Sequence, residues 1–145
     1  MITNYLTEDN MQHVKLVNDW EEAIKLAAKP LLEKKIIETV YIDNMIQSVK
    51  DNGPYIVLKD YFALPHAKAG EGVNEVGMSL LTLEDPVDLE GNPVKIFLVL
   101  AAVDSSTHLE ALSELSELLM DDDVYDIFLS GDNQAIYNEL IKGGK

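Results

Sequence analysis

The segment Val94-Lys95-Ile96-Phe97-Leu98-Val99-Leu100-Ala101-Ala102-Val103 is the most apolar part of this sequence. Its longest unbroken apolar run, 96–103, has no polar face, which is typical of a strand at the centre of a sheet covered on both sides. We therefore predict a central strand here. The run is far shorter than the roughly 20 residues of a membrane-spanning helix, so we expect no direct insertion into a membrane.

Helical and extended patterns alternate on both sides of this strand. Leucines recur at helical spacing from Leu109 to Leu119, with glutamates on the other face, and predict a helix. The remaining strands are expected at 14–17, 55–58, 62–66 and 76–83, with a turn at 84–86 and short helices at 123–129 and 134–141. Alternation of this kind predicts an α/β fold in which helices flank a sheet of mixed strand direction.

Two longer helices are expected in the first third of the chain. Asp19 has the properties of an N-cap, with Glu22 at the capping-box position. Pro30 should end or restart this helix, because proline lacks the backbone N–H that a helix interior uses. A second helix starts at Thr39 and ends at Asn52-Gly53-Pro54.

Length and composition limit the classes of function. The 145 residues suffice for one hydrophobic core, so we expect a single domain over 1–145. The sequence has no cysteine, which excludes disulfides, zinc–thiolate sites, iron–sulfur clusters and cysteine nucleophiles. The first ten residues, MITNYLTEDN, show no signal peptide, and we expect a cytoplasmic location.

The charge is strongly acidic and unevenly distributed. There are 26 acidic residues and 11 basic ones, a net charge of −15, and every basic residue is a lysine. Up to Gly70 the net charge is −2, and after it the net charge is −13. Such a chain repels phosphate backbones, so we expect no nucleic-acid binding. The acidic half fits either a basic protein partner or a surface that only confers solubility.

Two histidines stand in surroundings that suit chemistry, whereas His13 reads as a surface residue. His66 follows Ala63-Leu64-Pro65 and precedes a loop of alanines and glycines, which we expect to leave room for another molecule. His108 follows Asp104 and the hydroxyl residues Ser105, Ser106 and Thr107 at an expected helix start, where free N–H groups favour an anion such as phosphate.

Three interpretations of these histidines follow from the residues alone. A histidine can carry a phosphoryl group as a covalent intermediate. Two ordinary surface or capping histidines would give the same pattern. A metal site formed by His66, His108 and Asp104 is the third interpretation, although no metal-binding spacing supports it.

A family resemblance bears on this choice. The segments 41–46, 52–57 and 63–67, and then 100–104 with His108, resemble the EIIA domain of the phosphoenolpyruvate-dependent sugar phosphotransferase system. The similarity covers 19–141 and is to the mannitol/fructose type (type 2), within it most of all to the ascorbate branch. It implies a mixed, five-stranded sheet flanked by helices, as one EIIA domain over 1–145.

The resemblance also implies a phosphocarrier without a cofactor or metal. His66 would accept a phosphoryl group from the phosphohistidine of HPr and pass it to a cysteine of an EIIB component. His108 would orient the group without carrying it. The membrane component EIIC would be an indirect partner, and the pathway would serve uptake of ascorbate or a related sugar.

One departure from the family concerns the phosphoryl charge. Mannitol- and fructose-type members are expected to hold that charge with an arginine, and this sequence has none. The candidates to replace it are lysines and hydroxyl residues, namely Lys50, Lys68, Ser105, Ser106 and Thr107. Two alternatives to a transport role stay open: a regulatory module of the same fold and a catalytically silent interaction domain.

Overall fold

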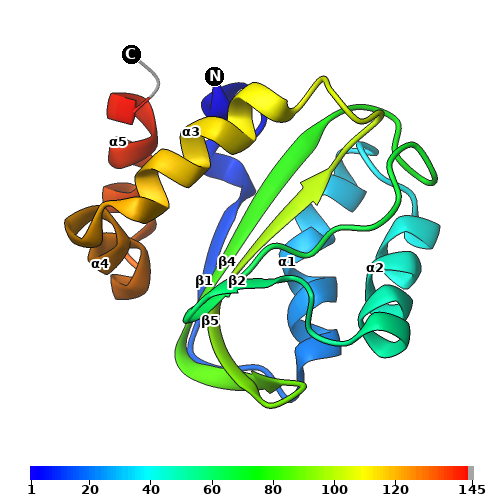
Figure 1. Cartoon of the computed structure of the whole chain (residues 1–145), viewed down its shortest axis with the longest axis horizontal. Helices are drawn as coiled ribbons and strands as arrows, with labels where there is room; N and C mark the ends of the chain where they lie inside the picture. Colours follow the sequence, from blue (N-terminus) through cyan, green and yellow to red (C-terminus); the bar gives the residue numbers. More distant parts are fainter. Residues whose placement is uncertain (144–145) are drawn as a thin grey trace.

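The computed structural model describes residues 1–143 and places a mixed sheet between two layers of helices (Figure 1). Residues 144–145, the end of the expected domain, lie outside the described part. Within that part the sheet has five strands in the order β1-β4-β5-β3-β2. Their bounds are β1 Met11–Val14, β2 Val57–Lys59, β3 Tyr61–Ala63, β4 Gly77–Leu89 and β5 Asn92–Ala101. The pairs β1–β4 and β3–β5 are parallel, and β4–β5 and β2–β3 are antiparallel, which confirms the predicted α/β class and mixed sheet.

Helices cover both faces of the sheet. In Figure 1, α1 (Trp20–Glu33) and α2 (Thr39–Asn52) lie on one side, and α3 (Leu109–Met120), α4 (Asp122–Ser130) and α5 (Asn133–Gly143) lie on the other. Two short 3-10 turns, η1 (Ile2–Asn4) and η2 (Glu8–Asn10), precede β1. Among residues 1–143, no helix is long and apolar enough to cross a membrane.

The strand predicted from the apolar segment is β5, and it is central. Phe97 and Val99 pack into the core beneath α1 and α2, whereas Leu98 and Leu100 pack into the core beneath α3, α4 and α5. Because side chains alternate along a strand, burial on both faces requires a sequence without polar alternation. β5 therefore joins the two hydrophobic cores.

The turn predicted at 84–86 is wrong. β4 continues through these residues, and its pairing with β5 shifts register between Thr82 and Val87. A proline lacks a donor for the ladder, and a bulge-like irregularity of this kind accommodates it without ending the strand. The chain reverses instead at Glu90 and Gly91, which have φ of 50° and 95°.

The expectation that Pro30 ends or restarts the first helix is also wrong, since α1 continues to Glu33. Proline cannot donate the N–H that would reach the carbonyl of Leu26. The side chain of Gln12 in β1 donates to that carbonyl at 2.7 Å, so its bonding capacity is used. At the other end of α1, Asp19 is the predicted N-cap and accepts the N–H of Glu22 at 2.8 Å.

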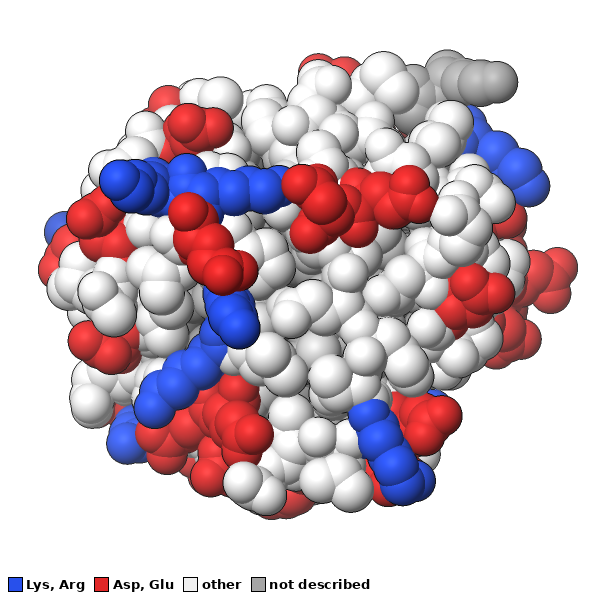
Figure 2. All heavy atoms as spheres, turned by 180° about the vertical axis from the view of Figure 1, so that it is seen from behind, with Lys and Arg blue, Asp and Glu red and all other residues white. Residues whose placement is uncertain are grey.

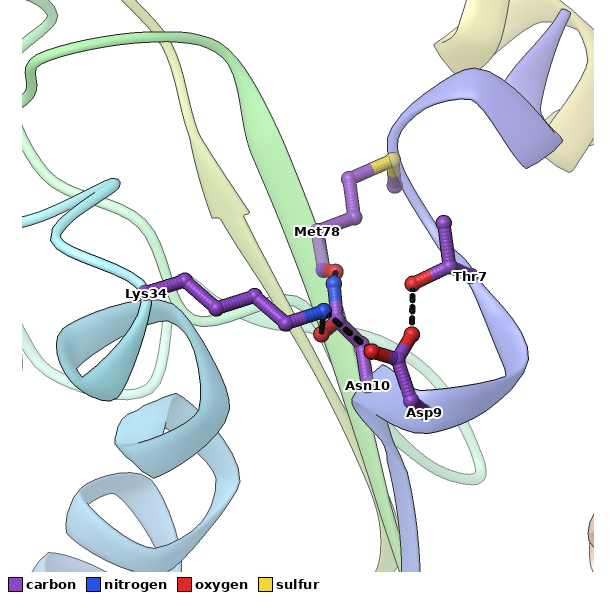
Figure 3. Close-up of polar contacts among 5 residues, drawn as sticks. All are labelled: Thr7, Asp9, Asn10, Lys34 and Met78. Carbon is purple, nitrogen blue, oxygen red and sulfur yellow. Dashed lines mark hydrogen bonds and ion pairs between the residues drawn. The ribbon is translucent and has the colours of Figure 1, made fainter.

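A polar cluster around the buried side chain of Asn10 joins η2 to the end of α1 and to β4 (Figure 3). Asn10 is only 2% exposed, and its side-chain amide donates to the carbonyl of Met78 at 3.1 Å. Its side-chain oxygen accepts from Lys34 at 2.6 Å, and Lys34 also contacts Asp9 at 2.7 Å. The hydrogen bond from Lys34 lowers the pKa of Asp9. Asn10 therefore connects three elements that are distant in sequence.

Replacing Asn10 tests this connection. Asn10→Ala leaves the Met78 carbonyl without its side-chain donor and removes one of the two partners of Lys34, and we expect the free energy of unfolding to fall by about 1–3 kcal/mol. Thr7→Val is the matched control, because its hydroxyl donates to Asp9 in a solvent-exposed position. Urea denaturation measures the free energy of unfolding of both variants. Equal stability of Asn10→Ala and the wild type would contradict the structural role.

Candidate functional site

His66 and His108 lie at the same edge of the sheet. His66 follows β3, and His108 follows β5. These strands are parallel neighbours, so their carboxyl ends meet at one edge. Loops at such an edge are a common place for ligand sites in α/β proteins. Two histidines separated by some forty residues in sequence are therefore brought to one region.

The loop that carries His66, residues 64–70, runs beside the end of β5. The N–H of Leu100 donates to the carbonyl of Pro65 at 3.0 Å, and the N–H of Gly70 donates to the carbonyl of Ala102 at 2.8 Å. We call residues 64–70 the His66 loop. Backbone hydrogen bonds at both ends fix its position relative to the strand that leads to His108.

The imidazole ring of His66 is oriented by two contacts. Its Nδ1 lies 2.6 Å from the carbonyl oxygen of Leu64. A carbonyl only accepts hydrogen bonds, so Nδ1 carries the hydrogen in the neutral ring and Nε2 has the free lone pair. The ring of Tyr55 meets the imidazole edge-to-face, with centroids 5.2 Å apart and planes at 82°. The half-buried ring of His66 thus has one nitrogen engaged and the other available as a nucleophile.

Two tyrosine hydroxyls bind the backbone of the His66 loop. The Tyr41 hydroxyl donates to the carbonyl of Leu100 at 2.6 Å and accepts the N–H of Ala67 at 3.1 Å. The Tyr55 hydroxyl donates to the carbonyl of His66 at 2.7 Å. Burial raises the pKa of Tyr41 to about 12 and also raises the pKa of Tyr55.

These tyrosines were not singled out from the sequence. The one available signal was a tyrosine, rather than leucine or phenylalanine, on the apolar face of a helix, since a buried tyrosine usually has a partner for its hydroxyl.

The glycines beside His66 have a different role from the one expected. Gly70 and Gly72 have φ of 90° and 76°, a region that favours glycine. A Cβ at Gly72 would lie 2.6 Å from Val40 and 2.9 Å from the backbone nitrogen of Tyr41. A Cβ at Gly70 would lie 3.2 Å from the carbonyl of Val103. The space where a Cβ would stand at these two glycines is used for packing within the chain. Whether another molecule has room at the His66 ring stays a prediction.

His108 occupies the N-cap position of α3 and is only 8% exposed. Its Nδ1 is buried and has no hydrogen-bond partner among residues 1–143. An unpaired buried polar atom costs about 1–3 kcal/mol, and such atoms are rare in native proteins. The Nδ1 atom of His108 is therefore both closed to solvent and without a hydrogen bond.

The hydroxyl residues before His108 already have a partner in the chain. One oxygen of Asp104 accepts the N–H groups of Ser106 and Thr107 at 2.9 and 2.7 Å. The other oxygen accepts the Thr107 hydroxyl at 2.7 Å. These hydrogen bonds, led by the Thr107 N–H, lower the pKa of Asp104 to about 2. Asp104 thus occupies the N–H groups of two of the predicted phosphate-binding residues, whereas no side chain caps the N-terminus of α3 itself. Phosphate binding by Ser105, Ser106 and Thr107 stays a prediction.

The structure separates the two candidate lysines. Lys50 lies near the end of α2 and forms an ion pair with Glu21 of α1 at 3.4 Å. Lys68 is exposed and belongs to the His66 loop, so it lies close to His66 in sequence and in space. A phosphate-binding role for either lysine stays a prediction. In the described part of the chain, no three His, Asp or Glu side chains gather to form a group that could hold a metal ion.

Exposed apolar side chains accompany both histidines. Val40 packs on Gly72, Tyr55 contacts the His66 ring, and Leu109 follows His108; these three are 43%, 39% and 53% exposed. The acidic run 121–123 lies at the opposite end of α3 from His108. On the face in Figure 2, lysines and acidic residues adjoin each other around a broad uncharged area. The acidic excess therefore does not form one continuous patch on that face.

Comparison with known proteins adds an independent observation. Residues 4–143 match the family described as "Phosphoenolpyruvate-dependent sugar phosphotransferase system, EIIA 2". The mannitol-specific cryptic phosphotransferase enzyme IIA component of Escherichia coli (strain K12) is 33% identical over 145 residues, 99% of each chain. An ascorbate-specific PTS system EIIA component of Mycoplasma pneumoniae is 36% identical over 109 residues, 73% of this chain and 69% of its own.

A solved structure agrees with these relatives. The solution structure of the mannitol-specific cryptic enzyme IIA from Escherichia coli superposes with a TM-score of 0.87 at 32% sequence identity, covering 96% of this chain and 97% of that one. The family match spans nearly the whole chain, and the full-length relative has the same fold. The chain therefore belongs to the EIIA type 2 family of the phosphoenolpyruvate-dependent sugar phosphotransferase system, whose members are phosphotransferases.

Proposed function

We propose that this chain acts as one EIIA domain over 1–145, in which His66 carries a phosphoryl group from phospho-HPr to an EIIB cysteine. The observation that carries the proposal is the contact of 2.6 Å between His66 Nδ1 and the Leu64 carbonyl. It engages one ring nitrogen and leaves the lone pair of Nε2 for attack on phosphorus.

Both transfers follow from this geometry. The Nε2 lone pair of His66 forms a bond to phosphorus while the bond from phosphorus to the donor histidine breaks, and the donor ring keeps that electron pair. In the second step the EIIB thiolate bonds to phosphorus, and the electron pair of the N–P bond returns to Nε2. The Leu64 carbonyl accepts the Nδ1 hydrogen throughout, which stabilises the positive charge of the phosphorylated ring.

His108 has the second role in this proposal, as the residue that orients the phosphoryl group. The group brings roughly −1.5 to −2 charges at neutral pH, and the sequence has no arginine to meet them. His108 stands at the same edge of the sheet as His66, at the N-cap of α3. A ring N–H is a suitable donor to a phosphoryl oxygen.

The proposed partners and location follow from the same site. HPr and EIIB would dock on the exposed apolar residues beside the histidines, and EIIC would be reached only through EIIB in the cytoplasm. The relatives bear the names of two substrates, mannitol and ascorbate. We assign uptake of ascorbate or a related sugar, a choice supported by the 36% identity to the ascorbate-specific relative and by the absence of arginine.

Phosphorylation of His66 is the first test. Incubation with phosphoenolpyruvate, enzyme I and HPr should add one acid-labile phosphate to the wild type and none to His66→Ala. His13→Ala is the matched control, because His13 lies in β1, at the edge of the sheet remote from β3. Mass spectrometry under neutral conditions measures the mass added by the phosphate. Labelling of His66→Ala at the wild-type rate would refute the assignment.

The role of His108 predicts a slower second step. Loss of one donor to developing charge costs about 2.7–4 kcal/mol, and we expect the lower end, roughly a hundred-fold slower transfer to EIIB in His108→Ala. His108→Gln keeps a donor and should recover part of the rate. Single-turnover transfer from the purified phosphoprotein measures both. Unchanged transfer in His108→Ala, or loss of all labelling in a folded His108→Ala protein, would contradict the division of roles.

The net charge of −15 predicts a salt dependence of association with HPr. Charges around an interface mainly change the association rate, and screening shortens to about 8 Å near 0.15 M salt. Phosphoryl transfer below saturating HPr should therefore slow between low and physiological salt. Stopped-flow or quenched-flow rates provide the measurement, with saturating HPr as the control. A constant rate at low HPr would show that the acidic residues only confer solubility.

A further inference from the structure

The hydrogen bonding of the His66 loop departs from a regular parallel ladder at one place. β3 pairs with β5 so that Ala63 is opposite Phe97, and the same register continued by three residues places His66 opposite Leu100. In a parallel ladder a residue donates to the residue before its opposite neighbour and accepts from the residue after it. Leu100 does donate to Pro65, at 3.0 Å. The regular pattern would then have Ala67 donate to the carbonyl of Leu100.

The Tyr41 hydroxyl stands in that position instead. The Ala67 N–H donates to the Tyr41 oxygen at 3.1 Å, and the Tyr41 hydroxyl donates to the Leu100 carbonyl at 2.6 Å. One backbone hydrogen bond is thus replaced by two that pass through a side chain from α2. Since Tyr41 is fully buried, its oxygen has a fixed position between the two chains. The hydroxyl separates the His66 loop from β5 just after His66.

Tyr55 binds the carbonyl side of the peptide unit whose N–H, that of Ala67, is bound by Tyr41. Its hydroxyl donates to the carbonyl of His66 at 2.7 Å, and its ring meets the imidazole at 5.2 Å. The His66 ring can reach the Leu64 carbonyl only if the backbone between them keeps its present path, because a hydrogen bond of 2.6 Å tolerates little displacement. The Tyr55 and Tyr41 hydroxyls bond to the C=O and the N–H of the peptide unit between His66 and Ala67, which adjoins this segment. They therefore restrict the backbone at His66 from its carboxyl side.

We infer that Tyr41 and Tyr55 are positioning residues for His66: the Tyr41 hydroxyl acts as a spacer in the β3–β5 ladder, the Tyr55 hydroxyl fixes the His66 carbonyl, and together they keep Nδ1 on Leu64 and Nε2 free. The kinetic consequence of this inference rests on the proposed phosphocarrier function, whereas its structural consequence does not. We assign neither tyrosine a direct part in the transfer. Both act through the backbone of the His66 loop.

Replacement of each tyrosine by phenylalanine keeps the ring and removes the hydroxyl. In Tyr41→Phe, either Ala67 bonds directly to Leu100 and draws the His66 loop towards β5, or both groups lose their partner. In Tyr55→Phe the His66 carbonyl loses its donor, while the edge-to-face contact is retained. The control is Tyr125→Phe. The Tyr125 hydroxyl also donates to a backbone carbonyl, that of Asp60, but it does so away from the carboxyl end of β5.

The first measurement needs no phosphoryl donor. Ring ¹⁵N NMR of the unphosphorylated protein, assigned with His66→Ala, gives the fraction of His66 that carries its hydrogen on Nδ1. We expect this fraction to fall in Tyr41→Phe and Tyr55→Phe and to match the wild type in Tyr125→Phe, although all three lose a hydrogen bond and some thermal stability. If Tyr41→Phe does not fold, Tyr55→Phe alone tests the inference, because Tyr55 is partly exposed and loss of its hydroxyl should leave the core intact.

The second measurement is steady-state acceptance from phospho-HPr. Misplacement of a reacting group by about 1 Å can cost a hundred-fold in rate, so we expect kcat to fall roughly ten- to hundred-fold in the two site variants with KM unchanged. Wild-type ring signals and wild-type kcat in folded Tyr41→Phe and Tyr55→Phe, or an equal loss in Tyr125→Phe, would overturn the inference. Failure of the wild type to accept phosphate would refute the proposed function alone, because the ring signals still report the position of His66.

Discussion

A buried backbone N–H or C=O requires a hydrogen-bond partner, and at the end of β5 this requirement determines where the His66 loop lies. β5 continues past the point where β3 ends, and its residue Leu100 is almost completely buried. The Leu100 N–H is satisfied by Pro65 and its carbonyl by the Tyr41 hydroxyl. The most apolar strand of the chain thus needs the His66 loop and α2 to complete its own bonding. The position of His66 is tied to the integrity of the central strand.

Both helical layers contribute a residue to this edge of the sheet. α2 supplies Tyr41 to the His66 loop from one face, and α3 begins at His108 on the other. Each layer is anchored by its own core, one under α1 and α2 and one under α3, α4 and α5, with β5 contributing to both. Side chains held by well-packed elements keep a site more precisely than free loops do. The candidate site therefore depends on the packing of both cores.

The structure shows which of the candidate phosphate-binding groups already have partners within the chain. In the loop before α3 the carboxylate of Asp104 occupies the N–H groups of Ser106 and Thr107, and Lys50 is paired with Glu21. In the proposed function, compensation of the phosphoryl charge therefore falls on ring N–H groups and on Lys68 rather than on a ready-made anion pocket. A carrier of this kind differs from arginine-based sites, in which a planar cation grips two oxygens at once.

Features that depend on neighbours in sequence could be predicted without the structure. Local periodicity predicts the central strand at 94–103, and capping chemistry predicts the N-cap at Asp19. Glycine predicts the helix stop at Gly53, because it readily adopts a positive φ, which is 82° in the structure. His66 and His108 were also singled out from the sequence, through short motifs, and their roles stay predictions. Membership of the EIIA type 2 family was confirmed by the comparisons.

Partners that come from distant parts of the chain were decided only by the tertiary structure. Pro30 remains inside a helix because Gln12 satisfies the carbonyl that it leaves unpaired, and β4 passes through 84–86 because a register shift accommodates the proline there. The insertion of the Tyr41 hydroxyl between Ala67 and Leu100 has no local signature at all. A sequence pattern reports which polar groups a segment has. Which group across the fold satisfies each of them is fixed only when the sheet and its two helical layers have packed.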